Sequence, residues 1–146
     1  MASIPAKLFI DASAFIALIH SKDRHHQEAV QYYTSLQKST LLLTTVLVVS
    51  ETYTWLRYRV GFSEATQFLD IVTETVETGW MRVVYPDPET VNKAHGILRR
   101  YPDQKLSYAD AVSIAVMEKS GVKDAFTFDV HFLALRKNVW PGIRTK

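Results

Sequence analysis

Four acidic residues stand out because each lies at the edge of a different apolar segment. They are Asp11 in "FIDASAF", Glu51 in "VVSETYTWL", Asp110 in "LSYADAVSIA" and Asp129 in "FTFDVHF". Carboxylates gathered in one pocket raise each other's pKa unless a cation lies between them. Mg²⁺ and Mn²⁺ prefer oxygen ligands and combine a few carboxylates with water and substrate phosphate. Such an ion can activate water and stabilise the leaving oxygen during phosphodiester cleavage. If the four side chains meet, the sequence therefore predicts a metal site for phosphodiester hydrolysis.

Each acid also has a simpler interpretation when it is taken alone. Asp11 could cap the helix that follows it, and Asp129 could be a turn residue after a strand. Asp110 could be only the acidic member of a capping box that begins at Ser107. Glu51 is harder to explain in this way, because its helix carries apolar residues on two faces and a buried glutamate needs a partner. The coincidence of all four favours the metal site.

Short β-rich runs alternate with longer helical patterns along the chain. The expected strands are 7–11, 41–45, 81–86, 125–128 and a short fifth within 138–143. The expected helix starts are Ser13, Ser63, Asp87 with Pro88 as the first helical residue, and Ser107. Strands separated by helices of this length predict a parallel sheet covered by helices on both sides, and ligands of such sheets gather at the carboxyl ends of the strands. Asp11 and Asp129 follow strands, while Glu51 and Asp110 lie early in helices, so one rim of the sheet could hold all four.

Composition sets outer limits on the protein class. The chain has 146 residues, of which 47% are hydrophobic and 22% charged, so we expect a single domain over residues 1–146. It contains no cysteine, which excludes disulfides and zinc–thiolate sites. We see no signal peptide and no apolar run near the roughly 18 residues of a membrane span, so we expect a cytoplasmic protein. The net charge of +2 permits a nucleic-acid partner without requiring one.

Taken in order, the four acidic motifs resemble those of the PIN-domain nucleases, most closely the small VapC-type toxins of toxin–antitoxin pairs. The resemblance extends from Lys7 to about Trp140. It implies a three-layer α/β/α fold with a central, mostly parallel sheet of four to five strands. It also implies an endoribonuclease that depends on Mg²⁺ or Mn²⁺ and cuts single-stranded RNA or RNA loops. The implied partners are a second copy of the chain, in a homodimer, and an antitoxin protein whose tail inserts near the acidic site.

The resemblance also assigns roles to individual residues. Asp11, Glu51, Asp110 and Asp129 would be catalytic and would share the metal pocket. The hydroxyl groups of Ser13, Ser107 and Thr127 would orient carboxylates or water, although each could equally be a cap or an ordinary strand residue.

Other polar residues compete for a place in the site. Asp124 precedes the strand that Asp129 follows, and about 13 Å of strand would separate them, so we interpret Asp124 as a solvated residue. We assign His25 and His26 a packing role at a helix start. We expect His95 and His131 to be surface or internally satisfied polar residues rather than ligands.

RNA binding requires positive charge near the acids, because bare carboxylates repel phosphate. Arg99, Arg100 and Lys105 flank the loop that leads to Asp110 and are the first candidates, although cations at a helix end are common without a ligand. Trp55 and Tyr58 share the helix face of Glu51 and could stack on unpaired bases. A dimer or antitoxin interface is the interpretation that we favour for these two aromatic residues.

Three other functions compete with that of a toxin. A housekeeping PIN-domain nuclease for RNA processing has the same fold and chemistry, and an adjacent antitoxin gene would separate the two. An aspartyl-phosphate phosphatase needs a second aspartate two residues after the first, where this chain has Ser13. A receiver domain needs an acidic pair just before the end of the phosphoacceptor strand and a late lysine after a strand, and the chain does not meet this pattern. A non-catalytic RNA-binding module would be expected to have lost some of the four acids.

Overall fold

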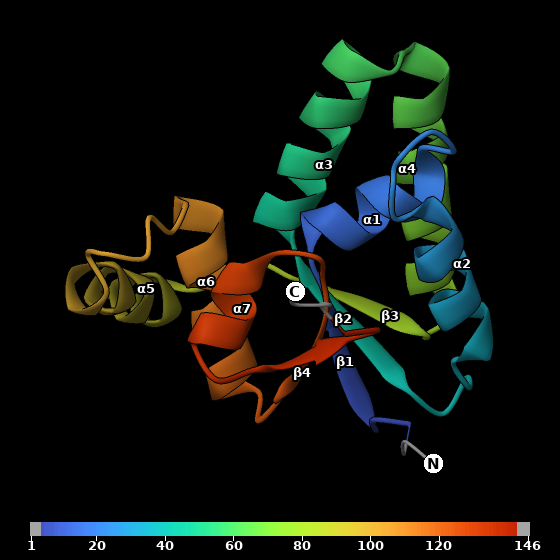
Figure 1. Cartoon of the computed structure of the whole chain (residues 1–146). Helices are drawn as coiled ribbons and strands as arrows, with labels where there is room; N and C mark the ends of the chain where they lie inside the picture. Colours follow the sequence, from blue (N-terminus) through green and yellow to red (C-terminus); the bar gives the residue numbers. More distant parts are fainter. Residues whose placement is uncertain (1–3, 143–146) are drawn as a thin grey trace.

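A five-stranded parallel sheet runs through the centre of the computed structural model, which describes residues 4–142 (Figure 1). The strands are β1 (Lys7–Ile10), β2 (Leu41–Thr45), β3 (Met81–Val84), β4 (Asp124–Phe126) and β5 (Asn138–Trp140). The helices are α1 (Ala12–Ile19), α2 (His26–Ser35), α3 (Val46–Arg59), α4 (Phe62–Glu77), α5 (Pro88–Arg100), α6 (Tyr108–Lys119) and α7 (Val130–Ala134).

The strand order β3-β2-β1-β4-β5 places a switch point beside β1. From β1 the chain first builds β2 and β3 on one side and later returns to build β4 and β5 on the other. All four pairings are parallel. The crevice outside the carboxyl ends of β1 and β4 is therefore where this class of sheet binds ligands.

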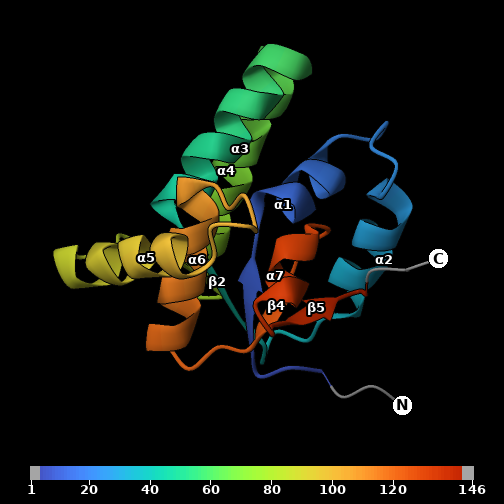
Figure 2. The same ribbon diagram turned by 60° about the vertical axis from the view of Figure 1, so that its left-hand side comes forward.

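Apolar side chains on both faces of the sheet fix the layers, in which α1, α2 and α4 cover one face and α6 and α7 the other (Figures 1 and 2). On the first face, the strand register aligns Leu8, Leu42 and Met81. On the second face, the ring of Phe9 stacks on Phe132 of α7 with their centroids 6.4 Å apart. This burial on both faces explains why β1 and β2 are apolar runs without alternation.

Several expected boundaries shift, mostly because a strand gives way early to a turn or helix. The first strand ends at Ile10, since Asp11 is already the N-cap of α1. The third ends at Val84 rather than at residue 86, and the fourth covers 124–126 instead of 125–128. The short fifth strand is present at 138–140, and residue 143 of its expected range lies outside the described residues.

Helix starts show two errors and two confirmations. Ser13 does not cap a helix, because it lies inside α1, and α4 begins at Phe62 after Gly61 rather than at Ser63. The expected start at Asp87 is confirmed, with its side chain accepting a hydrogen bond from the Thr90 N–H. The capping box that starts at Ser107 is also confirmed.

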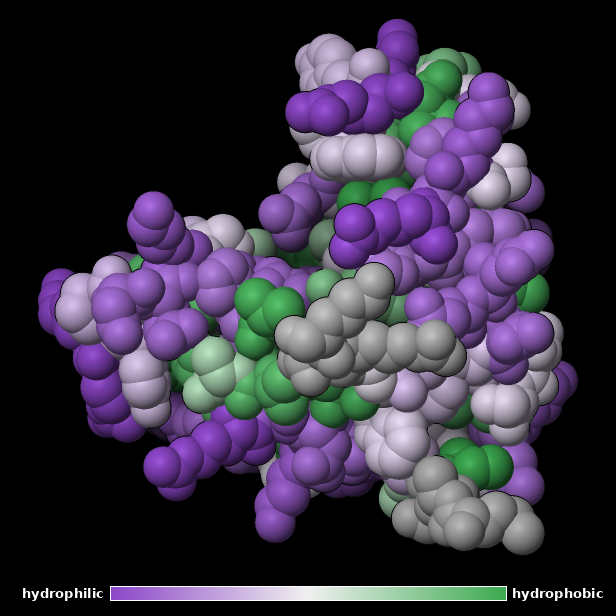
Figure 3. Space-filling model, viewed as in Figure 1, coloured by the Kyte–Doolittle hydropathy of each residue, from purple (hydrophilic) through white to green (hydrophobic). Residues whose placement is uncertain are grey.

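The hairpin of α3 and α4 projects as an arm from the sheet, and α5 and α6 form a separate lobe (Figure 1). The surface is hollowed between this arm and this lobe, and hydrophobic residues are visible within the recess (Figure 3). Between residues 4 and 142, no helix combines the length and apolar character needed to cross a membrane. The recess opens at the carboxyl-end rim of the sheet, where the predicted site should lie.

Candidate metal centre

Asp11 is a buried carboxylate held by two hydroxyl groups at the end of β1. Its side chain is 5% exposed, and its backbone N–H donates to the Phe126 carbonyl, which joins it to the end of β4. The hydroxyls of Ser13 and Thr127 both donate to Asp11 Oδ2, at 3.0 Å and 2.9 Å. Oδ1 has no such partner among the described residues, so one oxygen is fixed and the other remains available.

The same hydroxyl groups hold the loop that carries Asp129. The Ser13 oxygen accepts a hydrogen bond from the Phe128 N–H at 2.9 Å, and the Thr127 oxygen accepts one from the Asp129 N–H at 3.0 Å. The ring of His25 stacks on Phe128 at 4.3 Å, which gives His25 the packing role expected from the sequence. These contacts fix Asp129 relative to Asp11 across the switch point between β1 and β4.

Asp110 approaches from the first turn of α6. Its Oδ2 accepts a hydrogen bond from the Ser107 N–H at 3.1 Å, and Ser107 Oγ accepts one from the Asp110 N–H at 3.0 Å. Asp110 can therefore serve both in the capping box and in the site, because the capping box orients its carboxylate, and its side chain is only 13% exposed. Burial, followed by the negative charge of Asp129, raises the pKa of Asp110 above its usual value despite these hydrogen bonds.

Glu51 reaches the site from the second turn of α3 and is the most exposed of the four acids. Partial removal of the Glu51 carboxyl group from water, together with the negative charges of Asp110 and Asp129, raises the pKa of Glu51 above its usual value. Its helix buries Val48, Thr52 and Leu56. Leu47 and Trp55 on one side and Val49 and Tyr53 on the other are partly buried as expected, but Glu51 itself is exposed between them, and its acidic neighbours are those expected.

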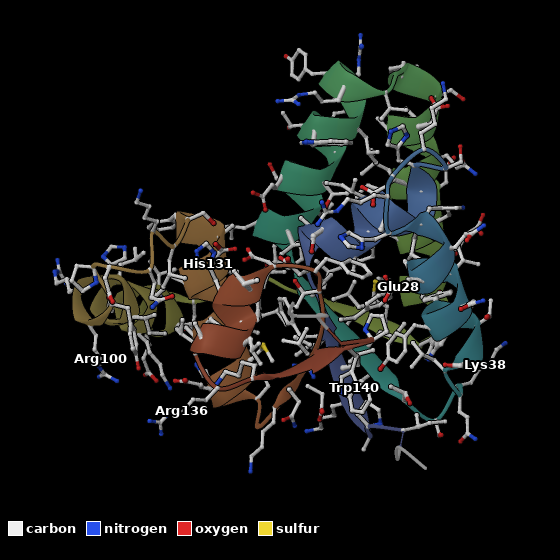
Figure 4. All side chains as sticks on the ribbon, viewed as in Figure 1. Glu28, Lys38, Arg100, His131, Arg136 and Trp140 are labelled. Atoms are coloured by element: carbon white, nitrogen blue, oxygen red, sulfur yellow. The ribbon has the colours of Figure 1, made fainter. Side chains whose placement is uncertain are left out.

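His131 was missed by the sequence reasoning and lies inside the cluster. Its Nδ1 is 2.9 Å from Asp129 Oδ1 and 3.8 Å from Asp110 Oδ2. The Nδ1 atom is buried but not aligned for a hydrogen bond with any described residue. Figure 4 shows the His131 side chain between α7 and the start of α6. A spacing of two residues after a helix-capping aspartate was the available signal, because it folds the side chain back toward the cap.

No lysine or arginine balances the charge of this cluster, and the one cation that the described residues bring close to it is His131 in its protonated form. Burial, with the charges of Asp110 and Asp129 adding to it, raises the pKa of Asp11 from 3.8 to about 6. No lysine or arginine between residues 4 and 142 forms an ion pair with the four acids. Among residues 4–142, the group whose ligand atoms all lie within 4.8 Å of one another consists of Asp110, Asp129 and His131; Asp11 and Glu51 fall outside this group and are coupled to it through charge. Clustered oxygen donors with an unmet negative charge fit a hard divalent cation.

The remaining candidates lie outside this cluster. Arg99 and Arg100 occupy the last turn of α5 and are exposed, and Arg100 points away from His131 (Figure 4). Lys105 is exposed in the loop before α6 and has a positive φ of 50°. Proximity in sequence to Asp110 therefore does not bring these cations into contact with the acids.

Asp124 differs from its expected role as a solvated residue. It begins β4 and accepts hydrogen bonds from Trp140 Nε1 at 2.9 Å and Asn138 Nδ2 at 3.1 Å. It thus joins β4 to β5 at the end of the sheet opposite Asp129. The separation of the two aspartates was predicted correctly, but the structural partners of Asp124 were not.

Comparison with known proteins gives the family context for this geometry. The PIN domain family matches residues 8–138. The 23S rRNA-specific endonuclease VapC20 of Mycobacterium tuberculosis is 32% identical over 127 residues, which cover 87% of this chain and 92% of the relative. The crystal structure of VapC20, described as a sarcin-ricin loop cleaving toxin, superposes with a TM-score of 0.81 at 30% identity, over 89% of this chain and 95% of that one.

A more distant structure supports the fold alone. VapBC2 from Rickettsia felis, solved with a DNA fragment from its promoter, has a TM-score of 0.67 at 12% identity and covers 91% of this chain and 96% of its own. The PIN family match over residues 8–138 and the 32% identity to VapC20 both agree with the observed parallel sheet covered by helices on both faces. The chain therefore belongs to the PIN-domain family.

Proposed function

We propose that this protein is a metal-dependent endoribonuclease and the toxin of a toxin–antitoxin pair, acting as a single domain over residues 1–146. The observation that carries the proposal is the buried Asp11 carboxylate, which two hydroxyls hold and whose pKa the charges of Asp110 and Asp129 help to raise, while no described lysine or arginine forms an ion pair with it. A protein retains such costly charge when a ligand compensates it.

The proposed ligand is Mg²⁺ or Mn²⁺, held by Asp11, Asp110 and Asp129 with Glu51 at the rim. When bound, such an ion supplies a Lewis acid that polarises a phosphate oxygen and lowers the pKa of water. Ser13 and Thr127 fix the orientation of the Asp11 carboxylate, and Ser107 fixes that of Asp110. These hydroxyl and amide contacts preorganise the ligands, so little reorganisation is needed when the site is filled.

Glu51 is suited to accept a proton at the edge of the site. It is open to solvent, and its pKa is raised by its surroundings and by its acidic neighbours, which brings it nearer to neutral pH than an ordinary glutamate. We assign it the role of a general base or of an outer ligand that holds water. In either role it acts on the solvent side of the cluster, where a phosphodiester would enter.

The relatives guide the choice of substrate and partner. VapC20 is named as a 23S rRNA-specific endonuclease, so an exposed loop of ribosomal RNA is the first substrate to test. A solved structure of similar fold from Klebsiella pneumoniae is a toxin–antitoxin complex. We therefore propose that an antitoxin protein inhibits this chain, and that the active form is a homodimer.

Removing and restoring the metal tests this function. The purified protein is stripped with EDTA and incubated with ribosomal RNA and, separately, transfer RNA, in EDTA alone and after addition of Mg²⁺ or Mn²⁺. We expect cuts at a few discrete sites that require a divalent ion and leave 5′-phosphate ends. Cleavage of equal strength in EDTA would contradict metal dependence, and absence of cleavage with either ion would contradict the nuclease.

A further inference from the structure

An open groove of about 590 Å³ adjoins the acidic cluster in the recess between α3 and α6. Its lining residues are Leu47, Ser50, Glu51, Thr54 and Trp55 from α3, and Ser107, Tyr108 and Ala109 from the start of α6. The volume lies within the range of about 300–1,000 Å³ usual for small-molecule sites. Glu51 and Ser107 belong both to this groove and to the proposed metal centre. Whatever occupies the groove is therefore next to the reacting phosphate.

Tyr108 forms one aromatic wall and is held in position although it is exposed. Tyr108 is the first residue of α6, and 47% of it is exposed at the protein surface. Its hydroxyl lies 2.8 Å from His95 Nε2, and the two rings meet edge to face at 5.5 Å. This anchor on α5 limits rotation of the ring, so that little conformational entropy is lost when a planar group packs against it.

Trp55 also lines the groove, from α3, and keeps an unused hydrogen-bond donor. The indole N–H groups of Trp80 and Trp140 donate to Thr40 and Asp124, respectively. The indole N–H of Trp55 has no acceptor among residues 4–142. The guanidinium of Arg59 lies over the Trp55 ring, 5.9 Å from its centroid, so one face of the indole already carries a positive charge and the rest of the ring is left for a ligand. A ligand with a flat face, a hydrogen-bond acceptor and a neighbouring negative charge matches these three features.

An unpaired nucleobase with its attached phosphate has that chemistry. In place of the dimer or antitoxin interface favoured for Trp55 from the sequence, we propose that the groove between Trp55 and Tyr108 binds one unstacked base of the RNA substrate, immediately beside the phosphodiester that is cut. This inference rests on the proposed nuclease function and adds a base-binding subsite to it. The site requires single-stranded or looped RNA, because the faces of a base inside a duplex are already covered by its neighbours.

Binding of short RNA by a non-cleaving parent protein tests the subsite. The parent carries Asp11→Asn, and the probe is a fluorescent single-stranded oligoribonucleotide of mixed sequence, about 12 nucleotides long. Tyr108→Leu and Trp55→Leu keep apolar bulk but remove the stacking face, so each is expected to weaken binding about 5- to 150-fold. Tyr108→Phe loses only the contact with His95 and is expected to bind nearly as the parent does.

A matched control and a second probe separate stacking from general damage. Tyr85→Leu removes an equally large ring that is 75% exposed and lines a different pocket, so it should leave binding unchanged. On an oligonucleotide of the same length whose bases are replaced by abasic sites, the losses at Trp55 and Tyr108 should disappear. Thermal unfolding of each variant establishes that it is folded.

The outcomes separate this inference from the proposed function. If Tyr108→Leu and Trp55→Leu bind as the parent does, or lose as much on the abasic probe, the base subsite is wrong. A parent without measurable binding to the probe also overturns it. Cleavage of ribosomal RNA by otherwise wild-type protein is measured in parallel: if it persists while the aromatic variants bind normally, the nuclease stands and only the subsite is rejected. If ring-dependent binding occurs but no RNA is cut, the subsite stands and the nuclease function is rejected.

Discussion

Asp11→Asn is expected to stabilise the metal-free protein at neutral pH while removing its activity. Burial is the main cause that raises the pKa of Asp11 from 3.8 to about 6. At about 1.36 kcal/mol per pKa unit, this rise corresponds to about 3 kcal/mol of unfolding free energy. Asparagine keeps an oxygen that can accept from both Ser13 and Thr127, so the local hydrogen bonds survive.

The pH dependence of this gain has a definite sign. In the unfolded chain the Asp11 carboxyl ionises near 3.8, and in the folded protein near 6. Between these values the folded state binds more protons, so wild-type stability falls as pH rises. Asparagine does not ionise, so the free energy of unfolding of the variant does not fall in this way as pH rises. Its advantage should be near zero at about pH 4, grow through about pH 6 and be complete above it.

Urea unfolding in EDTA at a series of pH values measures this difference directly. Comparing variant and wild type at each pH cancels the contributions of groups that do not interact with Asp11, whereas the coupling of Asp11 to Asp110 and Asp129 is part of the measured difference. The exposed Asp103 offers a control, since Asp103→Asn should follow the wild-type curve. A variant that is no more stable than wild type at about pH 8, or whose gain is the same at every pH, would refute the reasoning. Adding Mn²⁺ should reverse the order by stabilising wild type more strongly.

Three further predictions concern neighbouring residues. His131→Ala is expected to weaken Mn²⁺ binding about 10- to 100-fold in calorimetry, since its Nδ1 lies close to the carboxylates of Asp129 and Asp110, the proposed metal ligands; an unchanged affinity would show that it only packs. Asp87→Asn should lower the free energy of unfolding at neutral pH, because the Lys119 ammonium and the Thr90 N–H of α5 hold the pKa of Asp87 well below its usual range. This loss of stability should fade as pH falls through the acid range, and a loss that persists in acid would contradict this cause. Phe132→Ala should lose about 3–5 kcal/mol in urea unfolding, as its fully buried ring stacks on Phe9; a loss below about 1 kcal/mol would contradict that packing.

The order of elements could be predicted because each strand is a short apolar run and each helix has a local signal. Asp87 followed by Pro88, and Ser107 with Asp110, were read correctly because capping depends on neighbours in sequence. Strand ends were less predictable. Asp11 shows why: whether it ends a strand or caps a helix depends on the β4 contact through the Phe126 carbonyl, which is remote in sequence.

Side-chain partnerships that cross the fold were beyond the sequence. The local pattern predicted only a helix cap at Ser13, and its role of orienting a carboxylate was implied by the family resemblance alone; Ser13 hydrogen-bonds Asp11 and the Thr127 hydroxyl, more than a hundred residues away. His131 was expected to be a surface or satisfied residue because no acid was known to face it. Such contacts follow from which strand lies beside β1, and helical periodicity alone does not contain that information.

Cleavage of total cellular RNA by three proteins tests the central claim most directly. Wild type, Asp11→Asn and Asp124→Asn are compared with Mn²⁺ present, and Asp124 serves as the matched aspartate at the opposite end of β4. If the acidic cluster carries the reaction, we expect discrete cuts by wild type and by Asp124→Asn, and no cuts by a folded Asp11→Asn. Cuts by Asp11→Asn at the wild-type rate would place the reaction outside this acidic cluster and contradict the account.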